Sequence, residues 1–170
     1  MTELVPFDLN VHLEEYIQMN IEYQTWISDQ FKEHYQIDTV SMVGPVQEYV
    51  MDHLEPFISM KPPGGVLYIL KVDEKIAGMG AIKKLGESVG EVKRMWVRPE
   101  FRGRGLGKEM MRRLLDTGTE FGCSSFLLDS AKFMHAAHHI YRSAGFRDRG
   151  EYPESEPPKI LRAHYIYMEK

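Results

Sequence analysis

The chain of 170 residues is 43% hydrophobic and 27% charged, an ordinary composition for a globular protein, and its length fits a single domain over residues 1–170. A formal net charge of −4 argues against a nucleic-acid-binding protein, because such proteins are normally basic overall. The lone cysteine, Cys123, cannot form an internal disulfide, and neither a signal peptide nor a membrane-length apolar run is present, so we expect a cytoplasmic protein with no membrane partner.

The first third of the chain predicts one edge strand and a set of helices. Residues 5–7 favour the short edge strand. Between residues 12 and 36, apolar side chains recur every four positions, which is typical of a helix. Ser28 and Asp29 interrupt this pattern, so one helix and two successive helices are both open. A further helix is expected after Pro45.

A Pro-Pro-Gly-Gly loop separates this part from the rest, in which strands and helices alternate. The predicted elements are strands at 66–72, 76–85 and 88–97, a helix at 106–121, a strand at 125–129, a helix at 134–143, a strand beginning at Phe146 and a last strand at 163–168. Gly78 and Gly80 leave room for a group to approach the second strand closely. Residues 152–158 are rich in proline and are expected to form a long exposed loop. This order predicts a mixed sheet with helices on both faces.

A segment rich in glycine and arginine lies between the third of these strands and the next helix. Pro99 ends the strand because it has no N–H to donate. The segment that follows is Arg102-Gly103-Arg104-Gly105-Leu106-Gly107. A helix N-terminus offers unpaired N–H groups and the positive end of the helix dipole, both of which favour a phosphate. Glycine lets the backbone approach that phosphate and arginine adds charge-assisted donors, so we interpret the segment as an anion-binding loop.

Two common phosphate-binding loops fit this segment poorly. The loop of nucleotide triphosphatases needs G-x-x-x-x-G-K followed by Ser or Thr, which is absent. The dinucleotide fingerprint G-x-G-x-x-G is closer, because Gly103 and Gly105 follow a strand and Asp129 ends the next one. Its third glycine is replaced by Lys108, however, and too little chain follows Asp129 to complete a doubly wound sheet.

The motif Arg102-x-x-Gly105-x-Gly107 resembles the R/Q-x-x-G-x-G/A signature of the GNAT superfamily of N-acetyltransferases. Residues 91–99 look like the fourth strand of many small bacterial and archaeal members, and residues 137–146 resemble their A-x-x-L-Y-x-x-x-G-F segment. The resemblance is strong over residues 66–148. It implies an α/β fold of the GNAT type, with a mixed, mostly antiparallel central sheet of about six to seven strands and helices on both faces.

By this resemblance, the cofactor is acetyl-CoA, with its pyrophosphate on the backbone amides of the loop. The backbone of Met95 and Val97 would pair with the pantetheine arm as an extra strand does, and the Met95 amide would donate to the thioester oxygen. The implied cofactor-binding residues are Met95, Trp96, Val97, Arg102, Gly103, Arg104, Gly105, Leu106, Gly107 and Lys108. Many members carry Asn seven residues before the conserved Tyr of the motif to bond the pantetheine; here Met134 occupies that position.

Two residues are candidates for proton transfer. Tyr141 matches the Tyr that acts in the family as general acid toward the departing thiolate; a Tyr packed against the cofactor arm is the alternative. Glu91 lies six residues before Val97, where histone-type members carry their general base. A carboxylate in a strand cleft can have its pKa raised by desolvation and accept the amine proton. Alternatively, Glu91 is a partly exposed strand residue paired with Lys93 or Arg94.

Other side chains support weaker hypotheses. Three histidines, at positions 135, 138 and 139, have helical spacing but no HExxH motif and no acidic third ligand, so we expect a solvated helix face and no metal. Three aromatic residues of the first helix, Tyr16, Tyr23 and Trp26, are equally suited to an acceptor pocket and to the core. Cys123 is expected at a helix end.

Together these features predict an N-acetyltransferase that moves an acetyl group from acetyl-CoA to a primary amine of a small molecule or peptide. The acidic balance favours a cationic acceptor such as a polyamine or a lysine side chain. The alternatives are an acyl-CoA-binding sensor without turnover and a nucleotide-binding module. The oligomeric state is open, with a homodimer among the alternatives.

Overall fold

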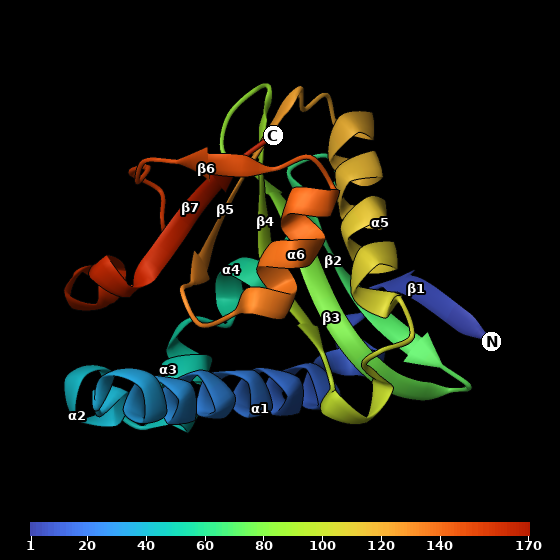
Figure 1. Cartoon of the computed structure of the whole chain (residues 1–170). Helices are drawn as coiled ribbons and strands as arrows, with labels where there is room; N and C mark the ends of the chain where they lie inside the picture. The colour runs from blue at the N-terminus through green and yellow to red at the C-terminus, as the bar shows by residue number, and fades with distance from the viewer.

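One seven-stranded sheet organises the computed structural model, which describes residues 1–170 (Figure 1). The strands are β1 (Thr2–Pro6), β2 (Gly65–Val72), β3 (Lys75–Lys84), β4 (Val89–Val97), β5 (Ser125–Ala131), β6 (Arg147–Arg149) and β7 (Tyr165–Glu169). Their order in the sheet is β1-β2-β3-β4-β5-β7-β6. All neighbours are antiparallel except β4 and β5. The predicted mixed, mostly antiparallel sheet is therefore confirmed.

Helices cover both faces of this sheet, as predicted (Figure 1). One face carries α5 (Leu106–Glu120) and α6 (His135–Ser143), and the other carries α1 (Leu9–Tyr35), α2 (Thr39–Val43), α3 (Val46–Asp52) and α4 (Glu55–Ile58). Two short 3₁₀ helices, η1 (Pro99–Phe101) and η2 (Lys159–His164), complete the chain. The helix α5 provides the crossover that a parallel pair of strands such as β4 and β5 requires.

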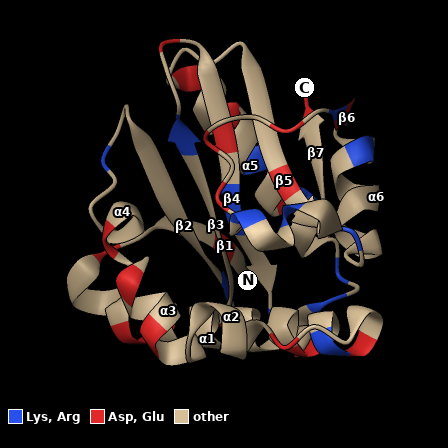
Figure 2. Ribbon diagram, turned by 90° about the vertical axis from the view of Figure 1, so that its left-hand side faces the viewer, with Lys and Arg blue, Asp and Glu red and all other residues tan.

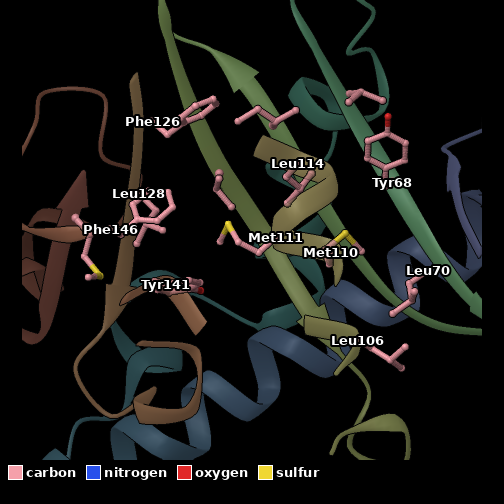
Figure 3. Close-up of a cluster of buried hydrophobic side chains, with 14 of the residues drawn as sticks. Tyr68, Leu70, Leu106, Met110, Met111, Leu114, Phe126, Leu128, Tyr141 and Phe146 are labelled. Carbon is pink, nitrogen blue, oxygen red and sulfur yellow. The ribbon is translucent and has the colours of Figure 1, made fainter. Parts of the chain in front are cut away.

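Each face of the sheet has its own hydrophobic core. The larger core, with 17 buried residues, lies under α5 and α6 and includes Met110, Leu114 and Tyr141 (Figure 3). The second core has nine buried residues and includes Tyr16 and Met19 of α1. Because both faces are covered, the central strands β2 and β3 are buried along most of their length.

The close approach predicted at two glycines of β3 involves the chain itself. A Cβ atom at Gly78 would collide with the carbonyl oxygen of Trp96 in β4, and one at Gly80 would lie 2.8 Å from the sulfur of Met110. These glycines therefore let β4 and α5 pack tightly against β3.

The first helix is continuous, which decides between the two alternatives that the sequence left open. It begins after Asp8, whose side chain accepts a hydrogen bond from the Asn10 N–H, and ends at Gln36, which has a left-handed φ of 56°. Ser28 lies inside this helix, and its hydroxyl lies 2.7 Å from the hydroxyl of Thr39 in α2. No helix of the protein combines the length and the apolar character needed to cross a bilayer.

Two expectations for the C-terminal part need correction. Residues 152–158 form the predicted loop, in which Pro153 and Glu154 are exposed, but Tyr152 and Ser155 are buried, at 2% and 4% exposed. The Arg162 guanidinium holds this segment inward by donating to the carbonyls of Ser155 and Pro157 at 2.7 and 2.8 Å. The last strand begins at Tyr165, because the residues before it form η2.

Candidate active site

A cleft opens where β4 and β5 stop pairing. Their parallel pairing covers three residue pairs and ends at Glu91 and Leu127. Beyond this point β5 pairs only with β7, and β4 bends at a bulge in which Arg94 has a φ of +53°. The separation leaves a cleft between the two strands.

The cleft has an apolar side and a charged side. The apolar side is lined by Val92, Met95, Leu128, Met134 and Tyr141, and the charged side by Lys93, Arg94, Asp129 and Glu156. The helices α1 and α3, the segment before β7 and the first residue of β7 contribute Tyr23, Gln24, Ile27, Tyr49, Pro157, Pro158 and Tyr165. Of the residues predicted for the site, the cleft therefore brings Met95 and Tyr141 together.

Five charged side chains, termed the charge cluster, meet at this place: Glu91 and Lys93, which are buried, and Arg94, Asp129 and Glu156, which are partly buried. Figure 2 shows acidic and basic segments on the neighbouring strands β4 and β5, in the middle of the sheet. The Lys93 ammonium is central, at 3.2 Å from Glu91, 3.6 Å from Asp129 and 3.0 Å from Glu156. Burial alone would lower the Lys93 pKa, but the three carboxylates outweigh it and raise the pKa above its ordinary value.

The bulge in β4 explains why two consecutive cations belong to one cluster. Successive strand residues normally point to opposite faces of a sheet. Lys93 and Arg94 nevertheless both bond Glu156, at 3.0 and 3.1 Å, because the bulge turns Arg94 toward the same face. Burial would raise the Glu156 pKa, but these two cations lower it below its ordinary value. The Arg94 guanidinium also lies over the Phe57 ring, 4.8 Å from its centre.

Glu91 lies behind the cleft wall. Glu91 is 2% exposed, and its carboxylate accepts a hydrogen bond of 2.7 Å from the Tyr152 hydroxyl. The expected pairing with Lys93 is confirmed, but the expected partial exposure is wrong. Burial raises the pKa of Glu91 even though Lys93 and Tyr152 stabilise its charged form. The Tyr152 hydroxyl lies 3.3 Å from Asp129, which does line the cleft.

The predicted anion-binding loop has the backbone geometry that this role requires. Gly103 and Gly105 have φ angles of +77° and +79°, and Gly105 caps the N-terminus of α5. No acceptor in the chain receives a hydrogen bond from the five consecutive N–H groups of residues 103–107. Figure 1 places this loop at the end of the sheet where β4 ends. Five free donors at a helix N-terminus are an arrangement that favours an anion, and the assignment of this loop to an anion stays a prediction.

The side chains around this loop differ in where they point. Arg102 turns back toward β4, where its Nε donates to the Val97 carbonyl at 2.9 Å and its guanidinium lies 4.5 Å from the centre of a Trp96 ring. Arg104 and Lys108 are exposed, whereas Leu106 is buried in the core. The absence of a side chain at Gly107 lets α5 approach Ile140 of α6, because a Cβ there would lie 2.8 Å from Ile140.

Tyr141 is buried on α6 and reaches the cleft from its apolar side. Burial raises its pKa well above the ordinary value for tyrosine. Its neighbour His138, expected on a solvated face, is 8% exposed and lies 3.1 Å from the Ser130 hydroxyl. His135 and His139 are exposed as expected. No group of three or more His, Cys, Asp or Glu side chains is arranged to hold a metal ion.

The aromatic residues of α1 divide between the core and the cleft. Tyr16 is 1% exposed and belongs to the core. Tyr23 lines the cleft, and its ring lies 5.3 Å from that of Trp96. Trp26 packs on Trp96 at 5.5 Å. The indole of Trp96 is therefore held between α1 and the side chain of Arg102 and does not face the cleft. Cys123 is a free, buried cysteine just after α5.

Sequence reasoning missed the charge cluster as a unit. Two adjacent charges in a strand that is otherwise buried, at Lys93 and Arg94, were a usable signal, because such charges need partners. Asp129 at the end of a buried strand was another. Nothing in the local pattern marked Glu156, because it lies in a proline-rich segment that was expected to be exposed.

The sequence and the fold identify the family. The family model described as the acetyltransferase (GNAT) family matches residues 24–146. The chain belongs to this family of acetyltransferases. It is 30% identical to an IAA acetyltransferase of Azospirillum brasilense over 129 residues, which cover 75% of this chain and 82% of that protein.

Two further similarities concern the length of the chain and its fold. An N-acetylaspartate synthetase of Rattus norvegicus is 35% identical over 92 residues, which cover 54% of this chain and only 31% of that longer protein. The structure of the PaiA N-acetyltransferase of Thermoplasma acidophilum, in complex with coenzyme A, has the same fold. It superposes with a TM-score of 0.70 at 14% identity and covers 100% of this chain and 98% of its own.

The charge cluster predicts a stability that depends on Lys93. We expect Lys93→Met to lower the free energy of unfolding by about 3–5 kcal/mol at pH 7.5, because Glu91, Asp129 and Glu156 lose their common counter-ion. Without Lys93, the folded-state pKa of Glu91, which burial already raises, rises further above its unfolded value of roughly 4. The variant's stability should then fall as the pH rises through that range, so its deficit should be smaller at pH 4.5 than at pH 7.5.

Urea unfolding at the two pH values measures this difference. Arg112→Met is the matched control, because Arg112 bridges Glu109 and Asp116 on the exposed surface of α5. It removes the same charge and should change stability little at either pH. An equal loss at both pH values for Lys93→Met would show that the side chain contributes packing and not charge.

Proposed function

We propose that the protein transfers the acetyl group of acetyl-CoA to a primary amine. The observation that carries this proposal is the run of five unpaired N–H groups at the start of α5, directly after the strand that forms one wall of the cleft. Coenzyme A is an anion with a long uncharged arm, which suits an anion site followed by an open strand edge. The Thermoplasma structure, which has the same fold, is a complex with coenzyme A.

The loop and the cleft would hold different parts of the cofactor. The pyrophosphate binds the backbone of residues 103–107, and the exposed side chains of Arg104 and Lys108 add positive charge. The arm lies along β4 at Met95 to Val97, where β5 no longer pairs. When bound, acetyl-CoA supplies an activated thioester. The Met95 amide is our candidate donor to the oxygen of that thioester.

The proton steps need an acid and a base. The amine attacks the thioester carbonyl carbon, the C–S bond breaks, and Tyr141 protonates the departing sulfur. The proton lost by the amine balances the one that Tyr141 gives up. Glu91 is the candidate base, supported by the rise of its pKa on burial. Because Glu91 does not line the cleft, we propose that it acts through the Tyr152 hydroxyl and Asp129.

The first prediction tests the loop. Gly105→Asp places a carboxylate among the free N–H groups, so the Kd for coenzyme A should rise at least tenfold, which is about 1.4 kcal/mol. Gly122→Asp is the matched control, because Gly122 also has a positive φ and open space around it but lies at the other end of α5. Calorimetry should find that Gly122→Asp binds coenzyme A tightly and that Gly105→Asp does not. In the parent protein, NAD and ATP should bind more weakly than coenzyme A. Equal affinity in both variants contradicts the loop assignment.

The second prediction tests the acid. Tyr141→Phe keeps the ring and removes the proton donor, so kcat should fall roughly 10²-fold while the KM for acetyl-CoA hardly changes. Tyr68→Phe removes a hydroxyl from the same core, where it bonds Thr117 at 3.0 Å, and should leave kcat unchanged. Release of free thiol measures both. An unchanged kcat in Tyr141→Phe would leave Tyr141 a packing residue.

The third prediction tests the base by changing the acceptor. An alkylamine with a pKa near 10 is protonated at neutral pH, whereas an aniline is neutral and needs less help. Glu91→Gln should lower kcat/KM roughly 10²-fold with the alkylamine and much less with the aniline. An equal loss with both would assign Glu91 to structure. If only Asp129→Asn shows the difference between the two amines, Asp129 is itself the base.

A further inference from the structure

A second cavity continues the cleft away from the sheet. This outer pocket lies between α1, α2, α3 and the segment that contains η2. Five residues line both it and the cleft: Gln24, Ile27, Tyr49, Pro158 and Tyr165. The remaining lining residues are Ser28, Thr39, Val40, Val43, Gly44, Val46 and Leu161. The outer pocket is therefore adjacent to the cleft and shares part of its wall.

The lining of the outer pocket carries no charge. None of its residues is Asp, Glu, Lys, Arg or His. The hydroxyls of Ser28 and Thr39 are 2.7 Å apart and satisfy each other. Ile27, Val43 and Val46 are half-buried in the protein, although they are apolar. These side chains would lose further contact with water if an apolar group entered the pocket.

The cleft and the outer pocket thus differ in polarity. The charge cluster at the cleft holds three carboxylates and two cations, so it can stabilise the ammonium form of an amine. Pro158 of the shared wall lies two residues after Glu156, which places the change in polarity close to the cluster. A second charge farther along the same molecule would lose its hydration in the outer pocket without gaining a partner.

We propose that the acceptor is a primary amine whose substituent is uncharged and apolar, an alkyl or arylalkyl group that occupies the outer pocket. This inference rests on the proposed function and names its substrate class. It replaces the polyamine that the overall acidity suggested, because the negative net charge is a property of the whole chain, whereas the outer pocket itself offers no carboxylate.

Matched amines test this inference. With the parent protein, kcat/KM should rise from methylamine to butylamine to hexylamine, by roughly two- to fourfold per methylene that the pocket buries. The compound 1,6-diaminohexane has the same chain as hexylamine but ends in a second ammonium. Its kcat/KM should be at least tenfold lower than that of hexylamine.

Two variants of α2 locate the effect. Val43→Glu places a carboxylate in the outer pocket, so it should lower kcat/KM for hexylamine. The ratio of kcat/KM for hexylamine to that for the diamine should fall toward one or below it. Met42→Glu is the control, because Met42 is on the same helix but is 45% exposed and does not line the pocket. Met42→Glu should keep the parent's preference for hexylamine over the diamine. Circular dichroism checks folding, and Val46→Glu on α3 tests the same pocket if Val43→Glu does not fold.

The outcomes separate the two proposals. If none of the amines causes release of thiol from acetyl-CoA, the proposed function is overturned, and this inference with it. Turnover that does not depend on chain length, or a diamine that matches hexylamine, would overturn the inference alone. A shift of preference in Met42→Glu as large as that in Val43→Glu would also overturn it, because the effect would then be one of general surface charge.

Discussion

The early end of the pairing between β4 and β5 is the constraint on which the candidate site depends. The crossover helix α5 makes the two strands parallel neighbours, but β5 then follows β7 while the bulge at Arg94 turns β4 away. The β4 backbone beyond Glu91 is left without a strand partner on that side, which is the condition for an extended ligand to pair there. The same strand then leads into the loop at residues 102–107, so the open edge and the free N–H groups follow each other along the chain.

The charge cluster explains how this opening is closed on its other side. Buried ion pairs contribute little net stability compared with an apolar core, because desolvation offsets their attraction. Their effect here is one of position. Lys93 and Arg94 hold Glu156, and Tyr152 bonds Glu91, so the segment before η2 becomes a wall of the cleft. This wall is ordered because Lys93 and Arg94 of β4 present their charges on the same face.

Polarity is graded along the path from cofactor to acceptor. Near Tyr141 the cleft is apolar, which suits an uncharged thioester and raises the pKa of the phenol. The middle carries carboxylates and cations, where an amine can exchange a proton. The outer pocket is uncharged again.

Features governed by local rules could be predicted from the sequence. Gly103 and Gly105 ahead of a helix and the alternation of strands and helices were recognisable because turn conformation, periodicity and helix ends depend on neighbouring residues. The motif around Tyr141 was recognised by its resemblance to the family's segment. The cluster of Glu91, Lys93, Asp129 and Glu156 was not. Arg94 and Glu156 are 62 positions apart and meet only because the sheet brings β4, β5 and the segment before β7 together. Burial and pairing of charges depend on such distant neighbours, so only the tertiary structure could decide them.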